Sequence, residues 1–339
     1  MAHRYLGNKT RLTPWLLEII SQYVSSGSVI ADPMCGTASA SLAFSEAGFN
    51  VRASDLLRCS YIFANSRLLF SSEASFANFG MSYADALHQL NTIEPKFGYF
   101  SKEFGESGSP ANGRAPRRYF TATNAGRIDA IRLQIKEWRE QGLDSLHCDV
   151  LLNDLMLAVN QVANISGTYG YFRNGFSSNS LRSLQLQSSP LVEKRDHEVR
   201  HGSLNEILPS LEVDLVYLDP PYTKRQYAAN YHILETIALE DEPVAQGDGG
   251  LRPWQNQSSN FCYRRKAPSA VIQAMENLTS SFAVWSYSAD GQISIENFVD
   301  ILTTFGQVDV FATEIDRYRS NSRGPSGVVT EYVLVCTIK

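Results

Sequence analysis

The run Asp219-Pro220-Pro221-Tyr222 has the residue types needed to hold an amino group for reaction. Its two prolines fix the backbone and remove two N–H donors, so the Asp219 carboxylate and the Pro220 carbonyl remain as acceptors that can face one way. An amino group on a heterocycle is planar and a poor nucleophile. Two acceptors on its hydrogens favour a pyramidal geometry that exposes the lone pair to an electrophilic methyl group as charge develops. Tyr222 offers a face for an extruded base. The alternative is a plain strand-ending turn, but this tetrapeptide is uncommon after an apolar strand.

Two earlier acidic residues each follow a predicted strand, and together they predict a cofactor site. Asp32 follows residues 29–31 and precedes Pro33 and Gly36, whereas Asp55 follows residues 49–54. Ligands bind at the carboxyl ends of strands in open α/β folds, where Gly36 permits close approach and Asp55 can accept hydrogen bonds from both ribose hydroxyls. The turn lacks the P-loop lysine and a complete G-x-G-x-x-G pattern, which favours a cofactor without a pyrophosphate.

The residues ahead of the first predicted helix form a third candidate. Tyr5-Leu6-Gly7-Asn8-Lys9 combines an aromatic residue, a glycine and a lysine. Such a segment could surround the carboxylate end of an amino-acid cofactor. A simple lead-in to the helix is the alternative.

These candidates require elements that bring them to one edge of a sheet. The pattern predicts a single α/β sheet interrupted by an insert of about 120 residues, in which residues 101–116 form a loop. The expected strands cover residues 29–31, 49–54, 197–201, 214–218, 282–287, 308–314 and 328–337. The expected helices cover residues 12–23, 40–47, 60–69, 124–141, 151–162, 230–239, 268–277 and 295–305.

Basic residues gather in two places, although the chain carries a formal net charge of −5. Local patches, not net charge, set the field that a polyanion meets. Both a nucleic-acid surface and an ordinary solvated helix face are compatible with these clusters. The first cluster lies within residues 114–139 and consists of Arg114, Arg117, Arg118, Arg127, Arg132, Lys136 and Arg139, opposed by Asp129 and Glu137. The second is Arg264-Arg265-Lys266, beside Phe261 and Tyr263.

The remaining composition narrows the class of protein. No run of eighteen apolar residues predicts a membrane span, and the first residues lack the apolar region of a secretory signal. The five cysteines are scattered without a C-x-x-C pair, which predicts neither a disulfide framework nor a metal site. A reducing cytoplasm is the compartment that these features favour.

The order of the motifs resembles that of the Dam-like class of DNA adenine-N6 methyltransferases. Y-x-G-N-K at residues 5–9 is followed by D-P-x-x-G-T at residues 32–37, an insert, and D-P-P-Y at residues 219–222. The following string R-Q-Y-x-x-N-Y-H-x-L-E-T at residues 225–236 is similar to that of type II-style modification methylases within the class. Segments 119–138 and 162–171, and Trp285-Ser286-Tyr287-Ser288 followed by Gly291, also resemble this group. The resemblance therefore extends over essentially the whole chain.

The resemblance implies a Rossmann-like sheet that binds S-adenosyl-L-methionine, with residues 1–70 and 191–339 as the catalytic domain. Residues 71–190 would form a mainly helical target-recognition domain that reads double-stranded DNA. Asp219 to Tyr222 would receive the target adenine, with Asp219 also beside the cofactor. In the family an acidic residue often lies near the cofactor's adenine; Ser203 stands in that region here, so the contact would fall to it or its backbone.

The same resemblance implies Tyr5 and Lys9 at the methionine moiety, Asp55 at the ribose, and Asp32, Pro33 and Gly36 in the cofactor loop. It implies no metal and no membrane partner. A cognate restriction endonuclease is a possible companion without being a stable subunit, and the enzyme is expected to be a monomer or a weak dimer.

Two other interpretations stay open at this point. The first keeps the chemistry but places it on RNA or on cytosine N4, because D-P-P-Y is shared with such enzymes; Asp in place of Ser before Pro-Pro-Tyr argues mildly against N4. The second is a catalytically silent DNA-binding subunit, against which the intact Asp32, Gly36, Asp55 and Asp219 argue.

Overall fold

The computed structural model describes residues 9, 11–111, 114–316 and 327–339 of the 339-residue chain. The chain divides into two compact units. We call residues 7–64, 195–227 and 257–339 the sheet unit, and residues 1–6, 65–194 and 228–256 the helical unit. Each unit is described by itself.

In the described residues, the sheet unit is built on seven strands in the order β3-β2-β1-β4-β5-β7-β6. The first five of these run parallel, and β7 is antiparallel to both β5 and β6. This confirms the expected α/β fold, with β6 and β7 as the predicted final hairpin. The strands are β1 (Val29–Asp32), β2 (Asn50–Asp55), β3 (Glu198–His201), β4 (Leu215–Leu218), β5 (Phe282–Ser288), β6 (Gly306–Asp316) and β7 (Val328–Ile338).

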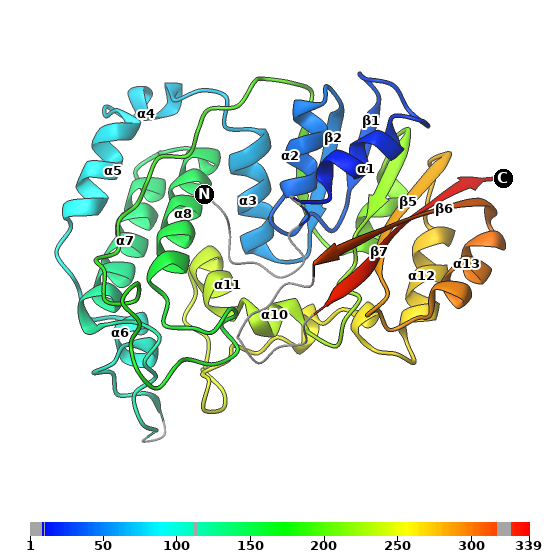
Figure 1. The fold of residues 1–339 in the computed structure, drawn as a ribbon. Coiled ribbons are helices and arrows are strands. Elements are labelled where there is room, and N and C mark those ends of the chain that lie inside the picture. Colours follow the sequence, from blue (N-terminus) through cyan, green and yellow to red (C-terminus); the bar gives the residue numbers. More distant parts are fainter. Residues whose placement is uncertain (1–8, 10, 112–113, 317–326) are drawn as a thin grey trace. The chain divides into compact units, whose positions relative to one another are not determined.

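Helices cover both faces of this sheet (Figure 1). Because side chains alternate along a strand, Val216 and Leu218 of β4 face a core that includes residues of α12 and α13, whereas Tyr217 faces the opposite side. There the ring of Phe44 from α2 meets Tyr217 edge-on at 5.4 Å. β4 is buried along its whole length, as an apolar parallel strand between two helical layers should be. The helices of this unit are α1 (Thr13–Ile20), α2 (Ser39–Glu46), α9 (Leu204–Ile207), α12 (Ala267–Glu276) and α13 (Ile295–Thr303).

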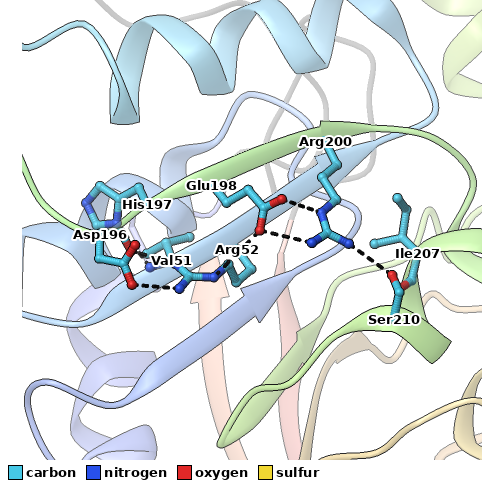
Figure 2. Close-up of polar contacts among 8 residues, drawn as sticks. All are labelled: Val51, Arg52, Asp196, His197, Glu198, Arg200, Ile207 and Ser210. Atoms are coloured by element: carbon cyan, nitrogen blue, oxygen red, sulfur yellow. Dashed lines mark hydrogen bonds and ion pairs between the residues drawn. The ribbon is translucent and has the colours of Figure 1, made fainter.

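Ion pairs of charged side chains stabilise the edge strand β3 beside β2 (Figure 2). Arg52 of β2 donates to the Asp196 carboxylate at 2.7 Å, and Arg200 of β3 pairs with Glu198 at 2.6 Å. His197 accepts the Val51 N–H at its Nδ1 and lies 2.7 Å from the Ser45 hydroxyl through Nε2. The arginines at this edge are therefore engaged within the protein.

The helical unit contains the whole of the predicted insert, residues 71–190. Its helices are α4 (Ala74–Asn78), α5 (Tyr83–Thr92), α6 (Tyr99–Phe104), α7 (Ala122–Glu140), α8 (Ser145–Val162) and α11 (His232–Leu239), while α3 (Arg58–Leu68) and α10 (Tyr227–Asn230) cross the boundaries between the units. A buried carboxylate, Asp154 of α8, accepts the Tyr83 hydroxyl at 2.5 Å and the Ser189 hydroxyl at 2.6 Å. These bonds tie the extended segment that follows α8 to α5.

Two features differ from the expectations drawn from the sequence. Residues 228–256 pack with the helical unit, in addition to the predicted segment 71–190, because groups such as the Thr236 carbonyl bind side chains of α7. Residues 101–104, predicted as part of a loop, belong to α6 and bury Phe104. Within the described ranges, none of the helices has both the length and the apolar character that a membrane span needs.

Candidate active site

The first part of the site is the turn between β1 and α2. Asp32 ends β1 and is 1% exposed; its Oδ2 accepts the Ser41 hydroxyl at 2.6 Å, while Oδ1 has no partner among the described residues. Burial raises the pKa of Asp32 to about 7 against the lowering effect of Ser41, and the nearby carboxylates raise it further. An unpaired buried acceptor of this kind is costly to a fold, which makes the turn a candidate for ligand binding.

Backbone conformation supports the same reading of this turn. Gly36 and Ala38 both adopt the left-handed region, with φ of 52° and 54°. For alanine this conformation is unfavourable, and such strain is concentrated at functional sites. The Gly36 N–H donates to Asp55 Oδ2 at 2.9 Å, and Leu57 N–H donates to Asp55 Oδ1 at 2.8 Å. Asp55 therefore ties the end of β2 to the turn that follows β1.

The second part of the site is the Asp219-Pro220-Pro221-Tyr222 turn after β4. Lys9 Nζ lies 3.3 Å from Asp219 Oδ1 and 3.4 Å from the Tyr222 hydroxyl. Burial raises the pKa of Asp219 to about 6, and the Lys9 ammonium opposes this shift. Burial by itself would lower the pKa of Lys9, but the Asp219 charge and its other neighbours hold that pKa well above its usual value. The ammonium consequently stays charged beside the carboxylate.

A second carboxylate, Glu331 of β7, completes this cluster. Its Oε2 lies 3.5 Å from Lys9 Nζ, and the residue is 6% exposed. Leu334 and Cys336 of the same strand belong to the core under α12 and α13, so alternation turns Glu331 to the opposite face. Lys9 thus bridges two carboxylates, one after β4 and one on β7. Glu331 was not among the residues predicted from the sequence, because its position beside Lys9 depends on the pairing of β7 with β5.

Aromatic packing fixes the position of Tyr222. Its ring meets Tyr287 of β5 at 5.5 Å, and its carbonyl accepts the Gln292 N–H at 3.0 Å. The Tyr287 hydroxyl accepts the Ile293 N–H at 2.8 Å, and a Cβ on Gly291 would lie 2.2 Å from the Tyr287 ring. Glycine at 291 is therefore what allows Tyr287 to stand behind Tyr222.

The other residues predicted for the site have the following positions and partners in the structure. Pro33 is buried directly after Asp32, and Pro220 is buried in the turn that follows β4. Ser203 donates its hydroxyl to Glu206 at 2.8 Å, in a capping box that begins α9. Tyr5 lies outside the described residues. The cofactor roles predicted for Lys9 and Ser203 stay predictions, and the structure adds the partners that their side chains have within the protein.

The basic cluster at residues 114–139 is largely not exposed to solvent, although both interpretations of the sequence, a nucleic-acid surface and a solvated helix face, required exposed side chains. Arg117, Arg127 and Arg132 are buried. Arg117 pairs with the buried Glu103 at 2.6 Å, and Arg132 donates to the carbonyls of Thr236 and Asp241. Two further members have partners within the unit: Arg139 pairs with Glu240 and Arg114 with Asp248. Most of these guanidinium groups bind carboxylates or carbonyls within the helical unit, because buried guanidinium groups need acceptors.

Comparisons with known proteins identify the family of this chain. Residues 5–293 match the family model described as D12 class N6 adenine-specific DNA methyltransferase. The chain is 30% identical over 332 residues to modification methylase StsI of Streptococcus sanguinis, covering 94% of this chain and 49% of that protein. It is 30% identical to type II methyltransferase M.FokI of Planomicrobium okeanokoites over 97% of this chain and 52% of that one. Against type II methyltransferase M.NlaIII of Neisseria lactamica the identity is 29%, over 94% and 92%. The chain thus spans about half the length of the first two relatives and nearly all of the third.

Proposed function

Because the chain belongs to the D12 class of N6 adenine-specific DNA methyltransferases, we propose that it methylates adenine N6 in double-stranded DNA, with S-adenosyl-L-methionine as the methyl donor. The target base would be rotated out of the duplex to reach the protein. The observation that carries the proposal is the half-buried Asp219 carboxylate, which lies just after β4 with Lys9 Nζ 3.3 Å from its Oδ1. The relatives named as modification methylases support the same class of substrate.

The turn after β1 suits this cofactor. Asp32 Oδ1 and the Ser54 hydroxyl are buried polar atoms without a partner in the described part of the chain, and they lie on the neighbouring strands β1 and β2. When bound, the cofactor supplies an electrophilic methyl group on a sulfonium centre. We assign its binding to Asp32, Pro33, Gly36 and Asp55. Tyr5, Lys9 and Ser203 remain additional predicted contacts.

The chemistry required of the protein is to hold the amino group and to stabilise positive charge on it. The Asp219 carboxylate and the Pro220 carbonyl would accept its two hydrogens, which favours the pyramidal nitrogen. Lys9 holds one oxygen of Asp219 and leaves the second carboxylate oxygen for the amino group. The ionised carboxylate can also receive a proton once the nitrogen carries the methyl group. Tyr222, supported by Tyr287, would stack on the base.

The partners are proposed from the same class of protein. The substrate would be double-stranded DNA whose sequence is read by the helical unit, and a cognate restriction endonuclease would act on the same sites without forming a stable complex. We propose a monomer or weak dimer that works in the cytoplasm.

The proposal is tested by replacing Asp219 with alanine. We expect the single-turnover rate of methyl transfer to fall by roughly 10²–10³ or more, because the amino group loses its principal acceptor. Calorimetry should still detect binding of S-adenosyl-L-methionine, although weakened. Glu212→Ala, at an exposed acidic residue just before β4, is the matched control and should keep full activity.

The products identify the substrate. Mass analysis of nucleosides from DNA and RNA of cells that express the protein should find N6-methyladenine in DNA. Methylation confined to RNA or to cytosine N4 would replace the proposed substrate, and a wild-type protein without cofactor binding would indicate a silent subunit. Full activity of Asp219→Ala would refute the assigned role of the turn.

A further inference from the structure

Five exposed basic residues of the sheet unit lie in two short segments. Lys224 and Arg225 come one residue after Asp219-Pro220-Pro221-Tyr222, which we call the catalytic turn, whereas Arg264, Arg265 and Lys266 lead into α12. No carboxylate in the described part of the chain forms an ion pair with any of the five. The segments themselves, residues 221–226 and 257–266, contain no acidic residue.

The two segments are held against each other by defined contacts. The Gln226 side chain donates to the Ser259 carbonyl at 2.9 Å and accepts the Ser259 N–H at 2.8 Å. The buried Cys262 thiol lies 3.4 Å from the carbonyls of Pro221 and of Arg225. These contacts bring Arg264 to Lys266 next to the segment that continues from Tyr222. We call residues 221–226 and 257–266 the basic rim.

The rim differs from three basic residues of the same unit that carboxylates neutralise. Arg52 and Arg200 are neutralised by carboxylates at the β3 edge (Figure 2), and Lys9 is bridged between Asp219 and Glu331. Lys266 also extends over the ring of Tyr263, with Nζ 5.1 Å from the ring centre, and Tyr263 is 40% exposed. In a chain of net charge −5, unpaired positive charge is thus concentrated beside the catalytic turn.

We propose that the basic rim binds the phosphates that flank the extruded adenosine nucleotide. The inference rests on the proposed function, since it takes DNA as the substrate. A base held at Asp219 stays joined to its own sugar and phosphates, so those phosphates must lie near the mouth of the site. Unpaired guanidinium and ammonium groups at that mouth are the groups that phosphate contacts use. Such contacts fix the position of the strand and carry no sequence information.

Salt dependence of DNA binding tests the rim directly. Each lost phosphate contact should reduce the slope of log K against log salt concentration by about 0.9. For the triple variant Arg264→Gln, Arg265→Gln, Lys266→Gln, three lost contacts reduce the slope by about 2.7. The affinity ratio between wild type and variant should then shrink by about 40-fold from 50 to 200 mM salt, measured by fluorescence anisotropy on a labelled duplex.

Two further variants keep the test decisive. Lys339→Gln removes one exposed charge at the end of β7 that contacts neither rim segment, and it should leave the slope unchanged. Lys224→Gln with Arg225→Gln should reduce the slope by about 1.8. Calorimetric cofactor binding equal to that of wild type establishes that each variant is folded; should the triple variant fail this check, the double variant decides.

The outcomes separate the rim from the reaction. A wild-type enzyme that methylates adenine in DNA, together with folded rim variants whose slope is unchanged, overturns the rim and leaves the proposed function intact. A slope that falls equally in Lys339→Gln also overturns it, because the effect would then be net charge alone. A wild type that methylates no adenine in DNA refutes the proposed function itself.

Discussion

Replacing Glu331 by glutamine removes one negative charge from the cluster around Lys9 while keeping the size of the side chain. Lys9 Nζ lies 3.3 Å from Asp219 Oδ1 and 3.5 Å from Glu331 Oε2. The two carboxylate oxygens are therefore at most 6.8 Å apart, which is the sum of these distances. Their repulsion adds to burial in raising the pKa of Asp219 to about 6.

The size of the effect follows from Coulomb's law. At that separation the repulsion is about 2.4 kcal/mol for an effective dielectric constant of about 20, and about 1.2 kcal/mol for about 40. Since about 1.4 kcal/mol corresponds to one pH unit, Glu331→Gln should lower the pKa of Asp219 by roughly 1–2. The variant also leaves Lys9 to Asp219 alone, which acts in the same direction.

The assay is the pH dependence of single-turnover methyl transfer on a saturating DNA duplex. The proposed mechanism requires ionised Asp219, so the wild-type rate should fall as the pH decreases through about 6. In Glu331→Gln this decline should move to lower pH by roughly 1–2 units. Lys9→Gln should move it to higher pH, because the ammonium that favours the ionised carboxylate is gone.

The two variants have opposite expected signs, so a general loss of stability cannot imitate the result. The other groups that contribute to the charge environment here are Asp32, Tyr217 and Tyr222, all retained in both variants. An unchanged decline in Glu331→Gln, in a protein that unfolds like wild type, would refute the idea that Glu331 sets the charge state of Asp219.

Three further changes have defined outcomes. Asp32→Asn should raise the free energy of unfolding at pH 8 by roughly 1–3 kcal/mol but not at pH 4, as urea titrations can measure. The reason is that burial raises the folded-state pKa of Asp32 to about 7, so the wild-type protein loses stability as the pH rises through about 7 and this carboxyl ionises. Arg117→Met should cost about 3–5 kcal/mol in the same titration by leaving buried Glu103 unpaired, and Glu103→Gln should recover part of it. Gly291→Ala should displace Tyr287, slow methyl transfer by about 10-fold and lower the free energy of unfolding by about 1–3 kcal/mol. An unaltered rate would show that Tyr287 does not support the site.

Local signals in the sequence were enough to find the acidic residues at strand ends. Asp32, Asp55 and Asp219 each follow a predicted strand, and each lies after or at the end of a parallel strand. Their neighbourhood follows from topology, since β2, β1 and β4 are adjacent in the sheet. Because neighbouring parallel strands end at the same edge of the sheet, acidic residues at their carboxyl ends lie near one another. The positions of these three residues could therefore be predicted without knowing any side-chain contact.

Glu331 and α6 show what local signals cannot reach. Glu331 is brought to Lys9 by the antiparallel insertion of β7 beside β5, which no pattern near residue 331 announces. α6 begins because Asp129, on α7, accepts the N–H groups of Gly98, Phe100 and Ser101. A helix whose N-terminus is capped by a residue about 30 positions away carries no cap in its own sequence.

The basic residues of this chain divide into two groups that the sequence did not distinguish: those that pair within the protein and those that stay unpaired. In the helical unit, guanidinium groups such as Arg117 and Arg132 satisfy buried carbonyls and carboxylates, so their charge contributes to stability and not to a phosphate surface. In the sheet unit, the basic rim keeps its charge unpaired beside the catalytic turn. Sequence discrimination by the helical unit would then depend on directed hydrogen bonds to base edges, while strand affinity near the target depends on the rim. Rim substitutions should accordingly weaken binding to all sequences equally, whereas substitutions in the helical unit that alter the recognised sequence should leave the salt slope near that of wild type.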